Sequence, residues 1–121
     1  MSNYKIKIGI DYHGVIDKNP RRFRVFAKDM IKENVEVHII TGTRKKDFKH
    51  KIPYTHFHSV TDDFLKRKIP YHIDENGNPS FDNEIWDKAK AEYCKKHKID
   101  LMIDDSDVYG KYFSTPYYQY R

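Results

Sequence analysis

The fold is decided by the stretch IGIDYHGVI, residues 8–16, in which a short apolar run ends in Asp11. An apolar run of this length is typical of a buried strand. Two later stretches have the same form: VHIITG, residues 37–42, and LMIDD, residues 101–105. Each passes from apolar residues into polar groups that suit phosphate or a metal ion. Because ligands bind at the carboxyl ends of strands in an open α/β sheet, we expect these polar residues to meet at one edge.

Strands and helices alternate along the chain, which predicts a parallel three-layer α/β sheet. Asn19 is a typical helix cap, Pro20 suits the first helical position, and Asn34 can close that helix in a left-handed conformation. Thr61 is expected to cap the next helix. The expected strands cover residues 4–11, 35–40, 54–60 and 99–103, with a short edge strand in the aromatic tail 112–120. The expected third helix runs from 83 to 97 and buries Ile85, Trp86, Ala89 and Tyr93.

The length and charge of the chain limit its class. At 121 residues it is expected to form one domain, residues 1–121, without a linker. The formal net charge of +5 favours anionic partners such as nucleotides, nucleic acid or phosphorylated metabolites. No apolar run approaches the roughly 20 residues that span a bilayer, and the N-terminus lacks the apolar region of a signal peptide. Cys94 is the single cysteine, so a reducing cytoplasm is the expected location.

Asp11 and Thr41 suit phosphate chemistry. A carboxylate at a strand end, followed by a tight turn at Gly14, can approach a phosphorus atom closely and act as a covalent nucleophile. The hydroxyl of Thr41 and the exposed backbone N–H groups around Gly42 can hold phosphate oxygens. Taken singly, an Asp that caps a turn and a Thr-Gly that ends a strand are common. The order of the motifs along the chain favours the phosphate site.

The adjacent pair Asp104-Asp105 is the most specific local feature. Two carboxylates at the end of an apolar strand repel each other unless a cation is present. Mg²⁺ prefers oxygen ligands and is often held by one or two carboxylates together with substrate phosphate. Asp11 and this pair therefore predict a magnesium site. The alternative is that the Asp104-Asp105 pair only caps a helix that follows the strand.

The three motifs in this order, Asp11, Thr41 and Asp104-Asp105, resemble those of the haloacid dehalogenase superfamily of phosphohydrolases. The resemblance covers about residues 4–108 and implies a three-layer Rossmann-like parallel sheet with no large cap. A cap directly after the first motif is excluded because the first helix follows too closely, and the later connection leaves room only for a small lid. The implied activity is that of a magnesium-dependent phosphatase acting on a phosphorylated small molecule or nucleotide.

The resemblance also implies roles for individual residues. Asp11 would be the nucleophile that forms an aspartyl-phosphate. A lysine would stabilise the transferred phosphoryl group, and the spacing favours Lys90, with Lys88 second. The implied metal ligands are Asp11, Asp104, Asp105 and the backbone carbonyl of His13. The implied substrate contacts are Thr41, Gly42, Arg44, Lys45 and Lys88.

His13 departs from the family pattern, which usually has a second Asp two residues after the first. In the resembled phosphatases the residue at this position protonates the leaving oxygen and then activates water. Three interpretations stay open. His13 replaces that acid and base, it leaves a slow enzyme or a binding protein, or it serves a different transfer reaction.

Basic residues follow two of the motifs. One group comes after the second strand: Arg44, Lys45, Lys46, Lys49, His50 and Lys51. Another follows the Asp11 loop: Arg21, Arg22 and Arg24. They predict a basic rim that engages a nucleotide or a nucleic-acid backbone, and the alternative is a solvated loop. The rim supports a second hypothesis, a weak or inactive enzyme that binds nucleic acid or another polyanion.

His56 and His58 are two residues apart and therefore share one strand face. Such a pair can bind a transition metal ion, but no third ligand is evident from the sequence. The favoured interpretation is that they are core or edge histidines. Cys94 is expected to be a small packing residue in the third helix.

Overall fold

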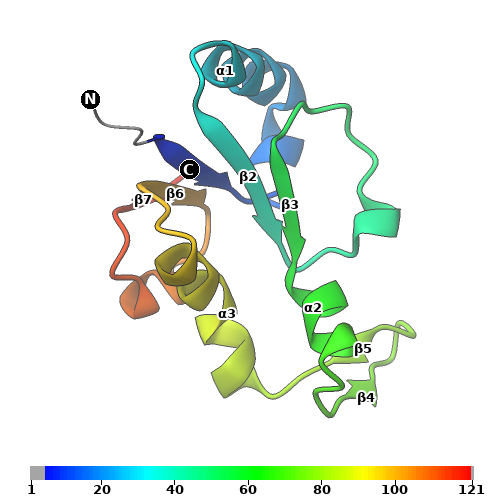
Figure 1. Cartoon of the computed structure of the whole chain (residues 1–121). Helices are drawn as coiled ribbons and strands as arrows, with labels where there is room; N and C mark the ends of the chain where they lie inside the picture. Colours follow the sequence, from blue (N-terminus) through cyan, green and yellow to red (C-terminus); the bar gives the residue numbers. More distant parts are fainter. Residues whose placement is uncertain (1–4, 121) are drawn as a thin grey trace.

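The computed structural model describes residues 5–120, which form a five-stranded sheet with helices on both faces (Figure 1). The strand order is β3-β2-β1-β6-β7, and every neighbouring pair is parallel. The strands of this sheet are β1 (Lys7–Ile10), β2 (Glu36–Thr41), β3 (His56–Ser59), β6 (Leu101–Asp104) and β7 (Tyr117–Gln119). The α-helices are α1 (Pro20–Lys32), α2 (Val60–Lys66) and α3 (Asn83–Lys96). The shorter elements are the 3₁₀ helices η1 (Ile16–Lys18), η2 (Lys45–Asp47) and η3 (Tyr109–Tyr112), and the strands β4 (His72–Ile73) and β5 (Pro79–Ser80).

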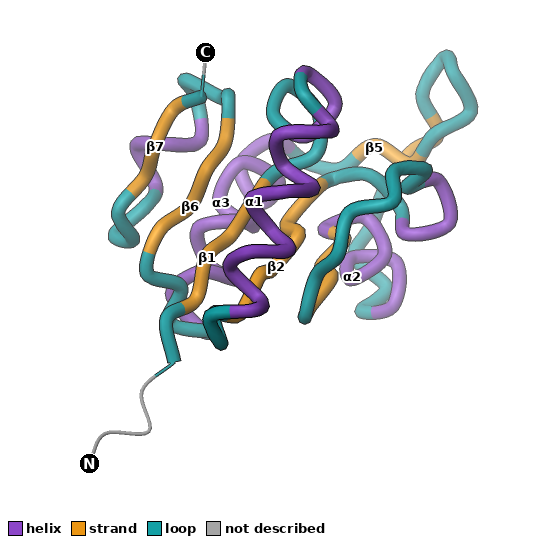
Figure 2. Tube along the Cα trace, turned by 90° about the horizontal axis from the view of Figure 1, so that it is seen from above, coloured by secondary structure: helices purple, strands orange, loops and turns teal. Residues whose placement is uncertain are grey.

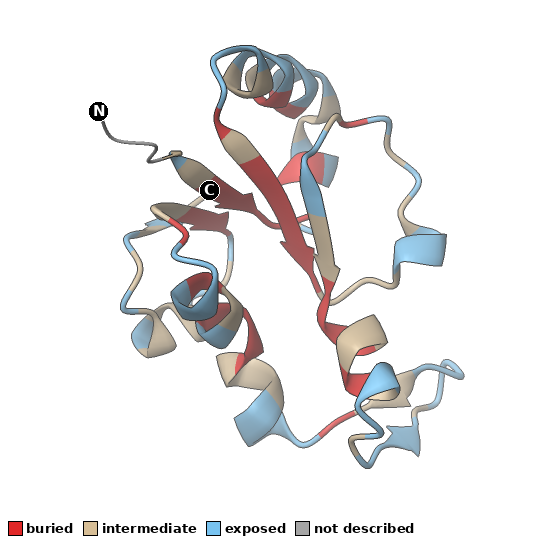
Figure 3. Ribbon diagram, viewed as in Figure 1, coloured by how far each residue is buried: buried red, intermediate tan, exposed pale blue. Residues whose placement is uncertain are grey.

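The sheet separates two apolar layers, and the predicted α/β class with a parallel sheet is confirmed. On one face, α1 buries Phe23 and Ala27 in a cluster that includes Val37 of β2. On the other face, Cys94 of α3 packs in a cluster with Met102 of β6. Figure 2 shows α1 in front of the sheet and α2 and α3 behind it. Burial is concentrated in the central strands, which are red in Figure 3.

The parallel register brings the ends of three strands to one edge. Ile10 of β1 pairs with both Ile39 of β2 and Ile103 of β6. The backbone N–H of Asp11 donates to the carbonyl of Ile103 at 2.9 Å, which extends the pairing by one residue. The residues that follow these positions therefore leave the sheet side by side.

The helices α1, α2 and α3 end in the same way. The second residue after each helix lies in the left-handed region: Asn34 with φ 65°, Lys68 with φ 58° and Lys98 with φ 55°. The N–H of the next, apolar residue donates to a carbonyl five residues earlier, in the pairs Val35–Met30, Ile69–Phe64 and Ile99–Cys94. This pattern is the Schellman motif, which satisfies carbonyls at a helix end. The prediction for Asn34 is confirmed. Lys68 and Lys98 adopt the same left-handed conformation, although Gly or Asn usually occupies this position.

The expected cap of the second helix is wrong by two residues. Ser59, not Thr61, is the cap, because its side chain accepts a hydrogen bond from the N–H of Asp62 at 3.0 Å. β3 runs directly into α2, so the helix begins at Val60 and Thr61 already lies inside it. The Thr61 hydroxyl instead donates to the carbonyl of Gly42 at 2.6 Å and ties α2 to the end of β2.

The packing face of α3 also differs from the expected one. Ile85 is 39% exposed, whereas the buried side of the helix consists of Ala89, Lys90, Ala91 and Cys94. Trp86 and Tyr93 are half-buried, and only the burial of Ala89 is as expected. The helix is rotated so that Lys90 faces the sheet.

Two strands begin later than expected. β1 begins at Lys7 and β3 begins at His56, and Tyr4, within the expected first strand, lies outside the described residues. The aromatic tail supplies the edge strand β7, as predicted. Between α2 and α3, β4 and β5 form an antiparallel hairpin. Within the described residues, no helix has both the length and the apolar character needed to cross a membrane.

The lysines at the helix ends generate a prediction about stability. A left-handed conformation costs a non-glycine residue roughly 1–2 kcal/mol, so Lys98→Gly should stabilise the fold by about 0.5–1 kcal/mol. Lys96→Gly, inside the last turn of α3, should instead destabilise it by about 1 kcal/mol. Urea unfolding of the two variants measures both changes, and a Lys98→Gly variant that is less stable than the wild type would contradict this assignment.

Candidate active site

Two buried carboxylates lie at neighbouring strand ends. Asp11 follows β1 and is 5% exposed, and Asp104 ends β6 and is fully buried. Each is oriented by a backbone N–H close to it in the sequence. The N–H of Tyr12 donates to Oδ1 of Asp11 at 2.8 Å, and the N–H of Ser106 donates to Oδ1 of Asp104 at 3.1 Å. These bonds fix the direction of both carboxylates.

Lys90 lies between the two carboxylates. Its Nζ is 3.0 Å from Oδ1 of Asp11 and 3.0 Å from Oδ2 of Asp104. The side chain is 8% exposed and comes from α3, on the face that the helix turns toward the sheet. A buried ammonium is stable only when it is paired and hydrogen-bonded. The two carboxylates therefore determine the rotation of α3, and that rotation leaves Ile85 outside.

The charges of this group perturb one another. Burial raises the pKa of Asp11 to about 7, while Lys90 opposes the rise and Asp104 adds to it. Burial on its own would lower the pKa of Lys90, but Asp11 and Asp104 outweigh it and raise that pKa overall. Lys90 is therefore a permanent cation. Burial, followed by the negative charge of Asp104, also raises the pKa of Asp105.

The carboxylates could hold a metal ion. Asp11, Asp104 and Asp105 each offer an oxygen atom, and these atoms lie within 4.8 Å of one another. When all three carboxylates are ionised, they exceed the one ammonium of Lys90 by two negative charges, which a divalent cation would balance. The donors are all oxygen, as Mg²⁺ requires, and exposed Asp105 opens the group toward solvent. The residues therefore fit a magnesium ion, although nothing in them singles out that element.

Thr41 and Gly42 lie beside the carboxylates in one cleft. The cleft has a volume of about 620 Å³ and contains Asp11, Lys90 and the Asp104-Asp105 pair as well. Thr41 is almost fully buried, and its Oγ1 accepts a hydrogen bond from the N–H of Thr43 at 3.1 Å. The side chain thus stabilises the turn that leaves β2. All the motif residues that the sequence predicts for this edge are brought together.

His13 lines the same cleft, but its side chain is 68% exposed. Its Nδ1 lies 3.2 Å from Oδ2 of Asp17, and the other oxygen of Asp17 accepts the N–H of Gly14 at 2.7 Å. A carboxylate only accepts hydrogen bonds, so Asp17 favours the proton on Nδ1 and leaves Nε2 as the nitrogen for chemistry. Sequence reasoning missed Asp17, although its spacing of four residues from His13 was a usable signal.

The basic residues predicted as substrate contacts, Arg44, Lys45 and Lys88, do not line this cleft. Arg44 pairs with Asp62 at 2.8 Å, and the same carboxylate accepts the backbone N–H of Lys45 at 3.0 Å. Lys88 pairs with Glu84, one turn earlier on α3, at 3.3 Å. Arg44 does line a smaller hollow of about 260 Å³, and Gly42 lines both this hollow and the cleft. Among the described residues that line the cleft itself, Lys90 is the only lysine or arginine.

An aromatic wall completes the cleft. Trp86 of α3 and Tyr109 of η3 both line it, and the indole Nε1–H of Trp86 donates to the Tyr109 hydroxyl at 3.1 Å. The Lys90 ammonium also lies 5.3 Å from the centre of the Tyr109 ring. From the sequence, Trp86 is predicted to be buried by the third helix, and no role is predicted for Tyr109. No local pattern marks a contact between side chains 23 residues apart.

Comparisons with known protein families, with curated proteins and with solved structures found no match for this chain. The resemblance argued from the motifs therefore gains no support from relatives.

Gly14 generates a prediction about the metal group. Gly14 and Gly77 have similar backbone angles, with φ 81° and 78°, but a Cβ on Gly14 would overlap the carboxylate of Asp105, whereas Gly77 faces open space. Both Gly14→Ala and Gly77→Ala should therefore lose about 1–2 kcal/mol of stability through the backbone.

Gly14→Ala should in addition displace Asp105 and weaken Mg²⁺ binding by about tenfold or more, with Gly77→Ala as the matched control. Calorimetric titration with Mg²⁺ measures this difference. Equal Mg²⁺ affinity in the two variants would show that Asp105 is not a ligand.

Proposed function

We propose that this protein is a magnesium-dependent phosphomonoester hydrolase that acts through an aspartyl-phosphate, in the manner of the haloacid dehalogenase superfamily. The observation that carries the proposal is the position of the Lys90 ammonium, 3.0 Å from both Asp11 and Asp104 at the open end of the sheet. A buried cation fixed between two carboxylates, with a third carboxylate and Thr41 beside them, provides the charges that phosphoryl transfer needs.

In the proposed reaction, Oδ2 of Asp11 attacks phosphorus, because Oδ1 is already engaged by Lys90 and the Tyr12 N–H. The P–O bond to the leaving group breaks as the bond to Asp11 forms. Lys90 and the backbone around Thr41 and Gly42 stabilise the phosphoryl oxygens. A bound Mg²⁺ ion, held by Asp11, Asp104, Asp105 and the carbonyl of His13, would neutralise charge on the phosphate.

His13 is assigned the acid and base role. Its Nδ1 faces Asp17, so the imidazolium form donates the Nε2 proton to the leaving oxygen. The neutral ring then takes a proton from water, which attacks the aspartyl-phosphate and releases inorganic phosphate and free Asp11. Asp17 is a positioning residue for this ring, because it holds the tautomer in which Nε2 exchanges the proton.

The proposed substrate is a phosphorylated small molecule or a nucleotide. Trp86 and Tyr109 provide aromatic surface beside the phosphate position, on which a base or another planar group can stack. The alternative, a nucleic-acid-binding protein that uses a basic rim, is less favoured because Arg44 is paired with Asp62 rather than directed into the cleft. We place the reaction in the cytoplasm, where the free, buried thiol of Cys94 stays reduced.

The hydrolase proposal predicts Mg²⁺-dependent release of phosphate from p-nitrophenyl phosphate or a nucleoside monophosphate. Asp11→Asn should abolish this release because an amide cannot act as the nucleophile. Asp29→Asn, on the exposed side of α1, is the matched control and should keep wild-type turnover. Phosphate assays across pH 5–9 measure both, and the proposal fails if the wild type releases no phosphate or if Asp11→Asn remains active.

The role of His13 gives a separate prediction. p-Nitrophenolate leaves readily without a proton, so His13→Gln should still form the aspartyl-phosphate from p-nitrophenyl phosphate but hydrolyse it slowly, by about 10²–10⁴-fold. Intact-mass measurement after an acid quench should show one added phosphoryl group, which hydroxylamine removes. A His13→Gln variant that turns over at the wild-type rate, without a phosphoenzyme, would remove His13 from the mechanism.

A further inference from the structure

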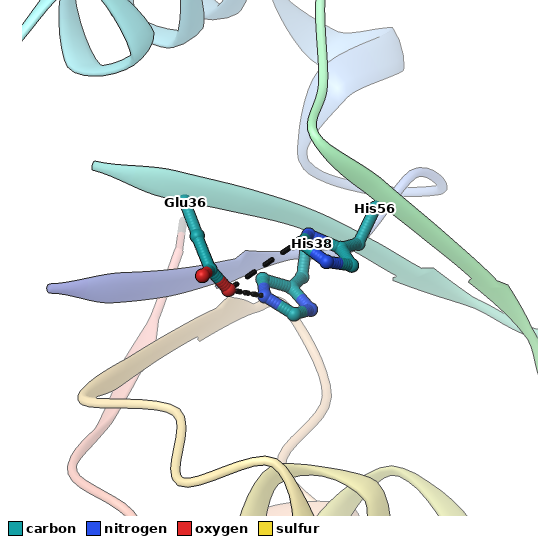
Figure 4. Close-up of side chains that lie close together, drawn as sticks. All are labelled: Glu36, His38 and His56. Carbon is teal, nitrogen blue, oxygen red and sulfur yellow. Dashed lines mark hydrogen bonds and ion pairs between the residues drawn. The ribbon is translucent and has the colours of Figure 1, made fainter. Parts of the chain in front are cut away.

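A second cluster of metal-ligating side chains lies away from the cleft. Glu36 and His38 belong to the first half of β2, and His56 is the first residue of β3 (Figure 4). Glu36 and His38 share a strand face because they are two residues apart. His38 and His56 are direct partners in the register of the two parallel strands. The sheet itself therefore brings the three side chains together on the face covered by α3.

The three side chains converge on one point. Oε1 of Glu36 lies 2.9 Å from Nε2 of His38 and 3.8 Å from Nδ1 of His56. The two imidazole rings are stacked, with their centres 4.2 Å apart and their planes within 5° of parallel. One ligand atom from each residue lies within 4.8 Å of the other two. We propose that Glu36, His38 and His56 bind a zinc ion that joins β2 to β3.

The donor set fits zinc better than magnesium. Zn²⁺ takes imidazole nitrogen and carboxylate oxygen at about 2.0–2.2 Å, often with three protein ligands and a water molecule in a tetrahedron. Ligand atoms in such a site are about 3.4 Å apart, so the separations of 2.9 and 3.8 Å from Oε1 of Glu36 need only small adjustments. Two nitrogen donors disfavour Mg²⁺, which prefers oxygen. The cluster therefore disfavours Mg²⁺, whereas the all-oxygen donors of the cleft suit it.

His38 is ready to act as a ligand. It is 2% exposed, and the neutral imidazole that a histidine offers is the form that binds a metal ion. Its Nδ1 lies 2.7 Å from the Tyr93 hydroxyl. When Nε2 binds zinc, the ring proton moves to Nδ1 and is donated to the oxygen of Tyr93. The Tyr93 hydroxyl then acts as an outer partner that orients the ligand.

His56 is the side chain that must adjust. Its Nδ1 lies 2.8 Å from Oγ1 of Thr55, which donates its own proton to the carbonyl of Val37 and so accepts from the ring. When zinc binds Nδ1, the ring proton moves to Nε2, and a coordinate bond replaces that hydrogen bond. The side chain is 49% exposed, so the change needs no rearrangement of the core and leaves a coordination position open to water.

His58, which the sequence paired with His56, is not part of this group. Its ring is stacked on Tyr93, with the ring centres 4.3 Å apart. The two other donors, which the sequence did not reveal, come from the neighbouring strand as Glu36 and His38. Because the cluster lies toward the start of β2 and the cleft lies at its end, the zinc ion is assigned a role in joining strands and none in phosphoryl transfer.

The test is calorimetric titration of the full chain with Zn²⁺. Wild-type protein is expected to bind one ion that His56→Gln weakens by at least tenfold, while Tyr93→Phe weakens it by about 10–100-fold. His72→Gln, an exposed histidine of β4, is the matched control and should bind as the wild type does. Because His56 is half-exposed, its replacement should leave the fold intact, which circular dichroism checks.

Binding in the cleft is separated by repeating the titration with Asp11→Asn. The proposal expects this variant to keep the zinc site, and it expects Zn²⁺ to raise the unfolding temperature of Asp11→Asn but not of the double variant Asp11→Asn with His56→Gln. No Zn²⁺ binding by the wild type, unchanged affinity in His56→Gln, or loss of the site in Asp11→Asn overturns the proposal. These outcomes are independent of whether the protein hydrolyses phosphate esters.

Discussion

The ion pair of Lys90 with Asp11 and Asp104 is the constraint on which the rest of the structure depends. A lysine that is 8% exposed needs charged partners, and the two carboxylates are equally buried at strand ends. Satisfying all three at once fixes the rotation of α3, the approach of that helix to β1 and β6, and the exposure of Ile85. Burial, with a smaller contribution from Asp104, raises the pKa of Asp11, and the excess of carboxylates over ammonium groups creates the demand for a cation.

The sequence predicts the parts of this arrangement that depend on one strand at a time. Asp11, Thr41 and Asp104 could be placed because each follows an apolar run, and parallel strands expose their ends at one edge. Lys90 could be placed, ahead of Lys88, through the spacing that the family resemblance implies before the last of these strands. The helix stops at Lys68 and Lys98 could not be predicted, because lysine is rare in the left-handed conformation and the motif is defined by backbone bonds.

Features that depend on the pairing of two elements escape a reading of the sequence alone. The cluster of Glu36, His38 and His56 exists only because β2 and β3 are in a register that places one histidine opposite the other. A shift of one residue would turn His56 to the opposite face and remove the cluster. The Trp86–Tyr109 contact likewise depends on where η3 returns to α3. The resemblance to a phosphatase family could supply roles for the strand-end residues but not for these.

The two proposed sites depend on the same helix. Lys90 contacts Asp11, and Tyr93, three residues later on the same side of α3, contacts His38 through its hydroxyl. A zinc ion that fixes His38 would strengthen its contact with Tyr93. The position of α3 at Tyr93 in turn affects the position of Lys90, one turn earlier in the helix. The coupling is short, because one helical turn separates the two residues. A helix whose polar residues meet the sheet at two successive turns is therefore held in register by polar contacts as well as by its small apolar face.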